Sequence, residues 1–107
     1  MKIRHAVLTE DGEVMECDLI TWAQWLEKNR AHRIIAQESL PGGYFISTVF
    51  LGLNHQYSPQ AEPLWFETMI FAPPAGDEVF CERYSTLAQA LAGHEEAKKT
   101  HQSDFQR

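Results

Sequence analysis

Long apolar runs, signal-like segments and closely spaced cysteines are all missing from this sequence of 107 residues. No apolar stretch approaches the roughly 20 residues of a membrane-spanning helix, so no membrane anchor is expected. The N-terminal segment carries basic residues without the apolar run of a signal peptide. The two cysteines, Cys17 and Cys81, lie far apart and in no C-x-x-C pattern, which argues against a disulfide framework or a thiolate metal knuckle. We therefore expect two free thiols in a cytoplasmic protein.

Clustered basic residues are missing too. Nine Lys and Arg residues stand against fifteen Asp and Glu residues, for a net charge of −6. Binding to nucleic-acid phosphates needs basic side chains gathered on one surface, and here only Lys98 and Lys99 are adjacent. A nucleic-acid partner is therefore not expected. An acidic protein can imitate DNA, but these carboxylates are dispersed rather than set in rows, so we rank that function last.

The residues that are present suit one packed domain. The chain is 44% hydrophobic and 11% aromatic, which favours a globular fold over disorder. Short β-branched and aromatic runs between turn residues predict an α+β domain over residues 1–107, with the order β-β-α-β-β-β-β-α and a frayed tail at 101–107. The expected strands are 2–8, 13–17, 32–39, 44–53, 64–71 and 79–84.

The two strongest strand signals are expected at the centre of the sheet. Residues 44–53 and 64–72 are rich in β-branched and aromatic side chains, so they should pair as central antiparallel strands of one meander. Both helices should pack on one face of this meander. The other face, or a strand edge, would then be left for a partner.

Both expected helices open with a T-x-x-Q capping box. The boxes are Thr21 with Gln24 and Thr86 with Gln89. In such a box the hydroxyl accepts a hydrogen bond from a free amide, while the glutamine side chain reaches back to the cap. The first helix should therefore begin near Thr21, and the last one near Ser85 or Thr86.

Glu67 is the residue whose surroundings most suggest chemistry. Its same-face neighbours on a strand would be Trp65 and Met69, which would desolvate the carboxylate and raise its pKa. With His55 and His94 it could form a site for proton transfer or for a metal. The three positions lack the tight spacing of zinc sites, so we expect no metal and no cofactor.

A simpler interpretation of the same residues remains open. Glu67 could pair with Arg83 on the next strand, and His94 could be a packed histidine on the apolar stripe of the last helix. We expect this arrangement. The enzyme or ligand-binding hypothesis then requires that His55, Glu67 and His94 converge on one pocket instead.

Aromatic residues supply the second group of candidates. Trp22, Trp25, Tyr57 and Trp65 provide more rings than a small core must bury, and protein interfaces are enriched in Trp and Tyr. At helical spacing, tryptophans more often belong to the core. The sequence thus favours a binding protein with a protein partner, and a homodimer is left open.

Three segments together resemble a group of small bacteriophage and prophage proteins. They are S-T-V-F-L-G-L-N-H at 47–55, F-E-T-M-I-F at 66–71, and R-Y-S followed by G-H within 83–94. The resemblance covers about half of the chain and implies a phage origin and an intracellular accessory role, with inhibition of host defence as the obvious subclass. It supplies no reaction. The motif positions that it picks out are His55, Glu67, Arg83, Tyr84, Gly93 and His94.

Overall fold

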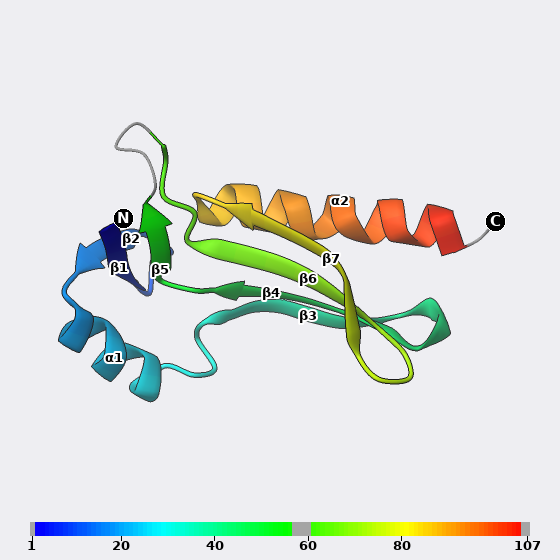
Figure 1. Cartoon of the computed structure of the whole chain (residues 1–107), viewed down its shortest axis with the longest axis horizontal. Helices are drawn as coiled ribbons and strands as arrows, with labels where there is room; N and C mark the ends of the chain where they lie inside the picture. Colours follow the sequence, from blue (N-terminus) through cyan, green and yellow to red (C-terminus); the bar gives the residue numbers. More distant parts are fainter. Residues whose placement is uncertain (1, 57–60, 106–107) are drawn as a thin grey trace.

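The computed structural model describes residues 2–56 and 61–105, with the backbone alone at positions 2, 55, 56 and 102–105. It is an α+β fold of two helices and seven antiparallel strands in two sheets (Figure 1). The elements are β1 (Lys2–Leu8), β2 (Val14–Cys17), α1 (Leu19–Lys28), β3 (Ile34–Leu40), the short 3-10 turn η1 (Pro41–Gly43), β4 (Tyr44–Phe50), β5 (Leu53–Gln56), β6 (Phe66–Ala72), β7 (Asp77–Tyr84) and α2 (Leu87–Phe105).

The predicted central pair of strands is confirmed. A four-stranded sheet has the order β3-β4-β6-β7, and a three-stranded sheet has the order β2-β1-β5. In the larger sheet Thr48 lies opposite Thr68, and Val49 lies opposite Glu67. These pairs fix which side chains of β4 and β6 share a face of the sheet, since directly opposed residues point the same way.

The prediction of one meander is wrong, because the chain leaves the larger sheet after Phe50. Gly52 adopts a left-handed backbone with φ of +66°, and the next residues form the additional strand β5 against β1. The amide of Ala6 donates to the carbonyl of Gly52 at 2.8 Å, which ties this turn to β1. The predicted strand at 44–53 is therefore two strands that belong to different sheets.

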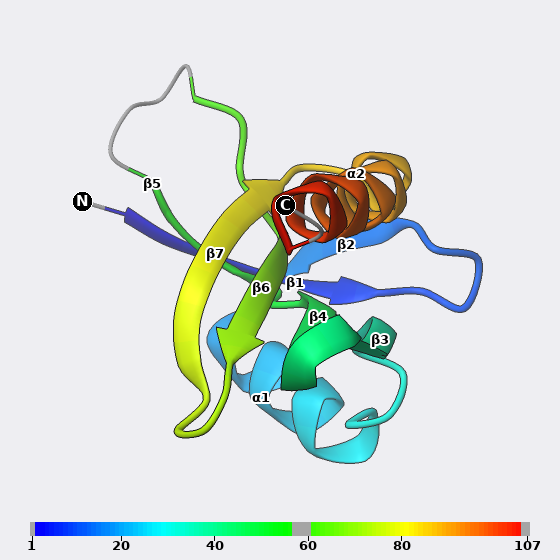
Figure 2. The same cartoon turned by 90° about the vertical axis from the view of Figure 1, so that its right-hand side faces the viewer.

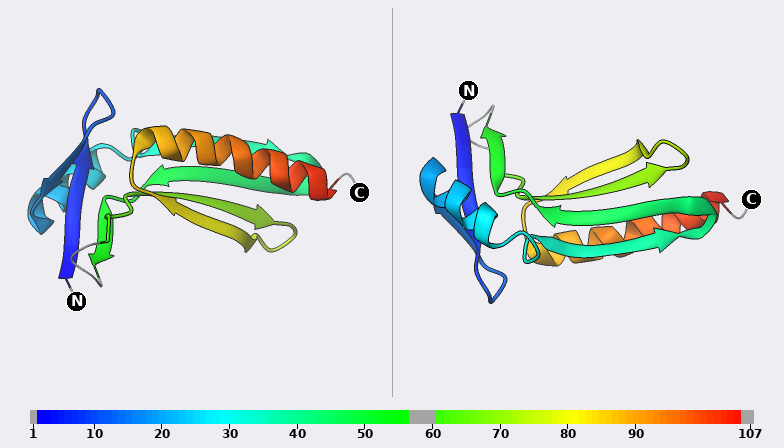
Figure 3. Two further views of the ribbon diagram at one scale, coloured as in Figure 1. Left: turned by 90° about the horizontal axis from the view of Figure 1, so that it is seen from above. Right: turned by 90° about the horizontal axis from the view of Figure 1, so that it is seen from below.

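The placement of both helices on one sheet face is also wrong. α2 runs along the four-stranded sheet and contacts all four of its strands, whereas α1 packs against β1. Figures 1 and 2 show α2 above β4 and β6, with α1 below them beside the smaller sheet. The two views in Figure 3 show the same division along the length of the molecule. Trp25 of α1 packs edge-on against Phe50 at the end of β4, with 5.5 Å between ring centroids, so α1 is held at the end of the larger sheet beside β1.

The hydrophobic core lies between α2 and the strands of the two sheets. One cluster of buried residues joins the two sheets and α2, and a second lies further along α2. Small residues of α2, Ala90 and Ala97, are buried in these clusters and let the helix approach the sheet closely. The first cluster consists of Ala6, Leu8, Phe50, Trp65, Phe66 and Ala90, and the second of Leu40, Ile46, Ile70 and Ala97.

The helix caps agree with the sequence at α2 and differ at α1. Gln89 N donates to Thr86 Oγ1 at 3.1 Å, and Thr86 N donates to Gln89 Oε1 at 3.3 Å, so the predicted box is confirmed. At α1 the cap is Asp18, whose carboxylate accepts from Thr21 N at 2.8 Å. Asp18 directly follows β2, so the helix begins there instead of near Thr21.

Three further observations concern the end of α2, the lengths of the helices and the thiols. α2 continues to Phe105, beyond position 100, where a frayed tail was predicted to begin. Neither described helix is long and apolar enough to cross a membrane. Cys17 and Cys81 are both free cysteines, as predicted.

Gly93 lies where α2 crosses the ring of Tyr84. A β-carbon at position 93 would overlap Cζ, Oη and Cε1 of Tyr84, whose ring is packed against the first core cluster. We expect Gly93→Ala to lower the free energy of unfolding by about 2 kcal/mol, a typical cost of overpacking, despite the higher helix propensity of alanine. Urea denaturation measures this change. In a Tyr84→Leu background the cost should fall below about 0.5 kcal/mol, and an equal cost in both backgrounds would contradict the packing explanation.

Candidate functional site

A buried polar network lies between α2 and the four-stranded sheet, centred on His94. The His94 side chain is 2% exposed. Its Nδ1 lies 2.7 Å from Thr48 Oγ1, and its Nε2 lies 2.8 Å from Glu38 Oε2. The hydroxyl of Thr48 is in turn hydrogen-bonded to that of Thr68, and Lys98 Nζ donates to Glu38 Oε1 at 2.8 Å.

These contacts define the proton positions on a neutral His94 ring. A carboxylate only accepts, so Nε2 carries the hydrogen and donates it to Glu38. Nδ1 then accepts from the hydroxyl of Thr48, which accepts from Thr68. Every nitrogen of this buried ring is thus satisfied within the protein, which is the arrangement of a structural histidine.

Glu38 and Lys98 are electrostatically coupled at the edge of this network. Hydrogen bonds from Lys98 and then from His94 hold the pKa of Glu38 below its usual value. The bond to Glu38 raises the pKa of Lys98. Because the folded-state pKa of Glu38 is lowered, its contribution to stability is present above the ordinary carboxyl pKa and is lost as the pH falls through the lowered value.

Two carboxylates and the His94 ring lie close enough together to be considered as metal ligands. Ligand atoms of Glu38, His94 and Glu95 lie within 4.8 Å of one another. However, the ammonium group of Lys98 already lies 2.8 Å from Glu38 and 3.6 Å from Glu95. A cation of the protein itself therefore neutralises the two carboxylates, and we assign no metal to this cluster.

Glu67 faces away from His94. Its carboxylate accepts from Arg83 Nε at 2.9 Å and lies 3.5 Å from Cys81 Sγ. Neighbouring residues of a strand point to opposite faces of a sheet, and Thr68 belongs to the α2 face. Glu67 and His94 are consequently separated by the sheet, and the convergence that the enzyme hypothesis requires does not occur between them.

His55, the third residue of that hypothesis, belongs to the smaller sheet. The backbone of His55 lies in β5, opposite Ile3 of the smaller sheet, and its side chain lies outside the described residues. Partial desolvation and the nearby Glu67 carboxylate raise the pKa of Cys81 to about 11. The Cys81 thiol is therefore protonated at neutral pH and is a poor nucleophile.

The predicted binding aromatics have different environments. Trp65 is 4% exposed and belongs to the core, with the Arg4 guanidinium over its ring at 5.8 Å. Trp25 is packed against Phe50. Trp22 is half-buried: its indole Nε1 donates to the carbonyl of Leu51 at 3.3 Å, and one side of the ring lines a cavity. Tyr57 lies outside the described residues.

The motif positions Arg83, Tyr84, Gly93 and His94 all have structural contacts. Arg83 binds Glu67, Tyr84 packs on Gly93, and His94 joins α2 to β3 and β4. The contacts of Tyr84, Gly93 and His94 belong to the packing of α2 on the sheet, whereas the contact of Arg83 lies on the opposite face.

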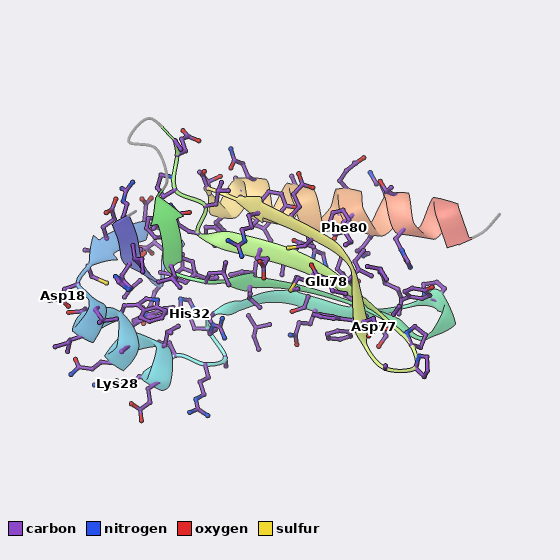
Figure 4. All side chains as sticks on the ribbon, in the orientation of Figure 1. Asp18, Lys28, His32, Asp77, Glu78 and Phe80 are labelled. Atoms are coloured by element: carbon purple, nitrogen blue, oxygen red, sulfur yellow. The ribbon has the colours of Figure 1, made fainter. Side chains whose placement is uncertain are left out.

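The most exposed functional candidate is the second face of the four-stranded sheet. The sequence predicted that a face or an edge would stay open, but it did not indicate which face. On the α2 side, Ile46 and Phe50 of β4 are fully buried, whereas Phe45 on the opposite side is 37% exposed. In the described part of the chain no helix runs along that opposite side, and α1 reaches only its end beside the smaller sheet. Figure 4 shows Phe80 of β7 on the side of α2 and Asp77 and Glu78 on the other. Both faces of β4 carry apolar residues, so sequence alternation gave no signal for which one stays open.

Comparisons with protein-family models, with curated proteins and with solved structures find no match to this chain. The fold and the site therefore define the class of the protein by themselves. It is an α+β protein in which one helix covers one face of a four-stranded antiparallel sheet, and a second helix and a three-stranded sheet close one end.

Proposed function

We propose that this chain is a protein-binding module that performs no chemistry and presents the uncovered face of its four-stranded sheet to a partner protein. The observation that carries the proposal is the exposure of this face. Phe45 lies opposite Phe71, and Ser47 lies opposite Met69. Adjacent apolar side chains on an uncovered sheet face, here Phe45, Phe71 and Met69, are a typical centre for an interface.

Charged side chains border these apolar residues. Exposed Glu78 is paired with Phe71 in the sheet register, so it lies on the same face, and Asp77 adjoins it. At the other end of the strands, the Glu67–Arg83 ion pair flanks Val49. An apolar centre with a polar rim suits a partner with apolar side chains opposite Phe45 and Phe71 and basic side chains opposite Asp77 and Glu78.

The chemistry of the interior supports a binding role over an enzymatic one. His94 is satisfied within the core, and Glu67 is paired with Arg83. The resemblance to phage proteins directs the search for the partner to proteins of the bacterial host cytoplasm. Inhibition of a host defence protein is the narrower form of this proposal.

The test uses a face variant and a matched helix variant of the purified protein. Phe45→Ser with Phe71→Ser changes the uncovered face, and Leu91→Ser changes an exposed leucine of α2. Each protein is used as bait in host cytoplasmic extract, and the captured protein is then purified for calorimetric titration. We expect the face variant to bind about 100-fold more weakly, since a central aromatic anchor contributes several kcal/mol, and the Leu91 variant to bind as the original chain does.

Melting temperatures of both variants establish that the fold is intact. Equal affinity of the face variant and the original chain for the partner would overturn the proposal. Light scattering tests whether a second copy of this chain binds to the face. A dimer that forms with the original chain and not with the face variant would show that the partner is a second copy and not a different protein.

A further inference from the structure

A cavity lies where α1 meets the uncovered side of the larger sheet. Its volume is about 320 Å³, which is within the range of small-molecule sites. Four apolar side chains and two arginines line it: Trp22, Leu26, Leu51, Leu53, Arg33 and Arg83. Two guanidinium groups at one cavity are notable in a chain of net charge −6.

Both arginines are fixed in place through Nε. Arg33 Nε donates to the carbonyl of Phe50 at 3.3 Å, and Arg83 Nε donates to Glu67 at 2.9 Å. Among the described residues, these bonds leave the terminal Nη donors of both groups for another acceptor. A guanidinium held in this way is prepared for a carboxylate, whose two oxygens match its fork of donors. Glu67 is then a positioning residue for Arg83, which lines the cavity, and has no catalytic role in this proposal.

The apolar wall is fixed as well. The indole of Trp22 is held by its bond to Leu51 and by the ring of His5, with 5.1 Å between ring centroids. An ordered aromatic surface beside leucines favours a flat or branched apolar group. A second cavity of about 430 Å³ shares Leu26 and Arg33 with the first and adds the oppositely charged Glu27 and Arg30.

We propose that this cavity binds a small molecule that combines an apolar body with one carboxylate. Arg33 and Arg83 bind the carboxylate, and Trp22 with the leucines contacts the apolar body. The ligand class is that of arylalkyl or short branched-chain carboxylic acids. This site shares Arg83 with the rim of the Phe45–Phe71 surface but none of its apolar residues. Because its test uses a free small molecule, it stands or falls independently of the proposed protein interface.

The test compares 3-phenylpropionate with its neutral amide, 3-phenylpropionamide. Chemical-shift changes of the Trp22 indole N–H and of the Arg33 backbone amide report binding. We expect saturable binding of the acid in the millimolar range and binding of the amide about tenfold weaker, because the amide lacks the charge that the arginines recognise. Arg33→Gln and Arg83→Lys should each weaken binding of the acid about tenfold.

Lys28→Gln is the matched control, since it removes the same charge as Arg33→Gln from a residue of α1 that does not line the cavity. It should leave the affinity unchanged. If Arg83→Lys disturbs the fold, the Arg33 and Lys28 variants decide the outcome. The proposal is overturned if the acid gives no saturable shift, if acid and amide bind equally, or if Lys28→Gln weakens binding as much as Arg33→Gln. If an acidic side chain of a partner protein occupies the cavity instead of a small molecule, the free acid will give no saturable shift.

Discussion

Replacing Gly52 with alanine is expected to lower the free energy of unfolding by about 3 kcal/mol, the sum of a backbone and a steric cost. The φ of +66° places Gly52 in the left-handed region that alanine avoids. A β-carbon there would overlap the carbonyl oxygen of Ala6 and would lie 2.7 Å from Trp22 Nε1 and 2.9 Å from Phe50 Cε2. A backbone oxygen in the middle of β1 cannot move aside without disturbing the smaller sheet. Chemical denaturation followed by tryptophan fluorescence measures the loss.

Gly76→Ala is the matched control for this prediction. Gly76 has a φ of +80°, and a β-carbon there would meet nothing within 4 Å. Its replacement should therefore cost only the backbone part, about 1 kcal/mol. Similar losses for the two variants would show that the close contact at Gly52 is unimportant. A much larger loss at Gly52 would identify the turn between β4 and β5 as the joint that fixes one sheet against the other.

Replacing His94 with alanine is expected to cost about 3 kcal/mol of unfolding free energy. The substitution opens a cavity between α2 and the sheet, and it removes one of the hydrogen-bond partners of Thr48 and one of those of Glu38. Thermal and urea denaturation at neutral pH measure the change. His94→Gln, which keeps a donor and an acceptor in the site, should recover part of the loss.

Glu95→Ala tests whether the loss of stability in His94→Ala comes from the buried imidazole ring. Glu95 is the next residue of α2, is exposed, and forms an i,i+3 ion pair with Lys98 at 3.6 Å. Its removal should change stability by less than about 0.5 kcal/mol, since exposed ion pairs contribute little. If His94→Ala were as mild as Glu95→Ala, the network would not be a structural element and its catalytic interpretation would need to be reopened.

Much of the local structure could be predicted from the sequence, because the signals act over a few residues. The Asp11-Gly12 turn between β1 and β2 and the Thr86–Gln89 cap depend on short-range geometry. The strand character of β4 and β6 follows from their own β-branched and aromatic residues. The pairing of Glu67 with Arg83 was also accessible, since it follows from adjacent strands once the register of β6 and β7 is known.

The candidate site depended on contacts between distant parts of the chain. The alternation in β6 requires that Glu67 and Thr68 face opposite sides, but both faces carry apolar residues, so the sequence could not tell which face α2 covers. Arg33 had no local signal at all, because its cavity exists only where α1 meets the larger sheet.

What the sequence by itself determined is therefore the set of elements: an acidic α+β chain with strong central strands and a capped C-terminal helix. The tertiary structure decided how these elements divide between two sheets. That division depends on Gly52, whose left-handed turn transfers the chain from β4 to a partner strand near the N-terminus. The signal for a flexible residue is local, but the strand that it reaches lies some fifty residues earlier. Only the packed chain specifies that pairing, because it is stabilised by surface buried jointly by both sheets.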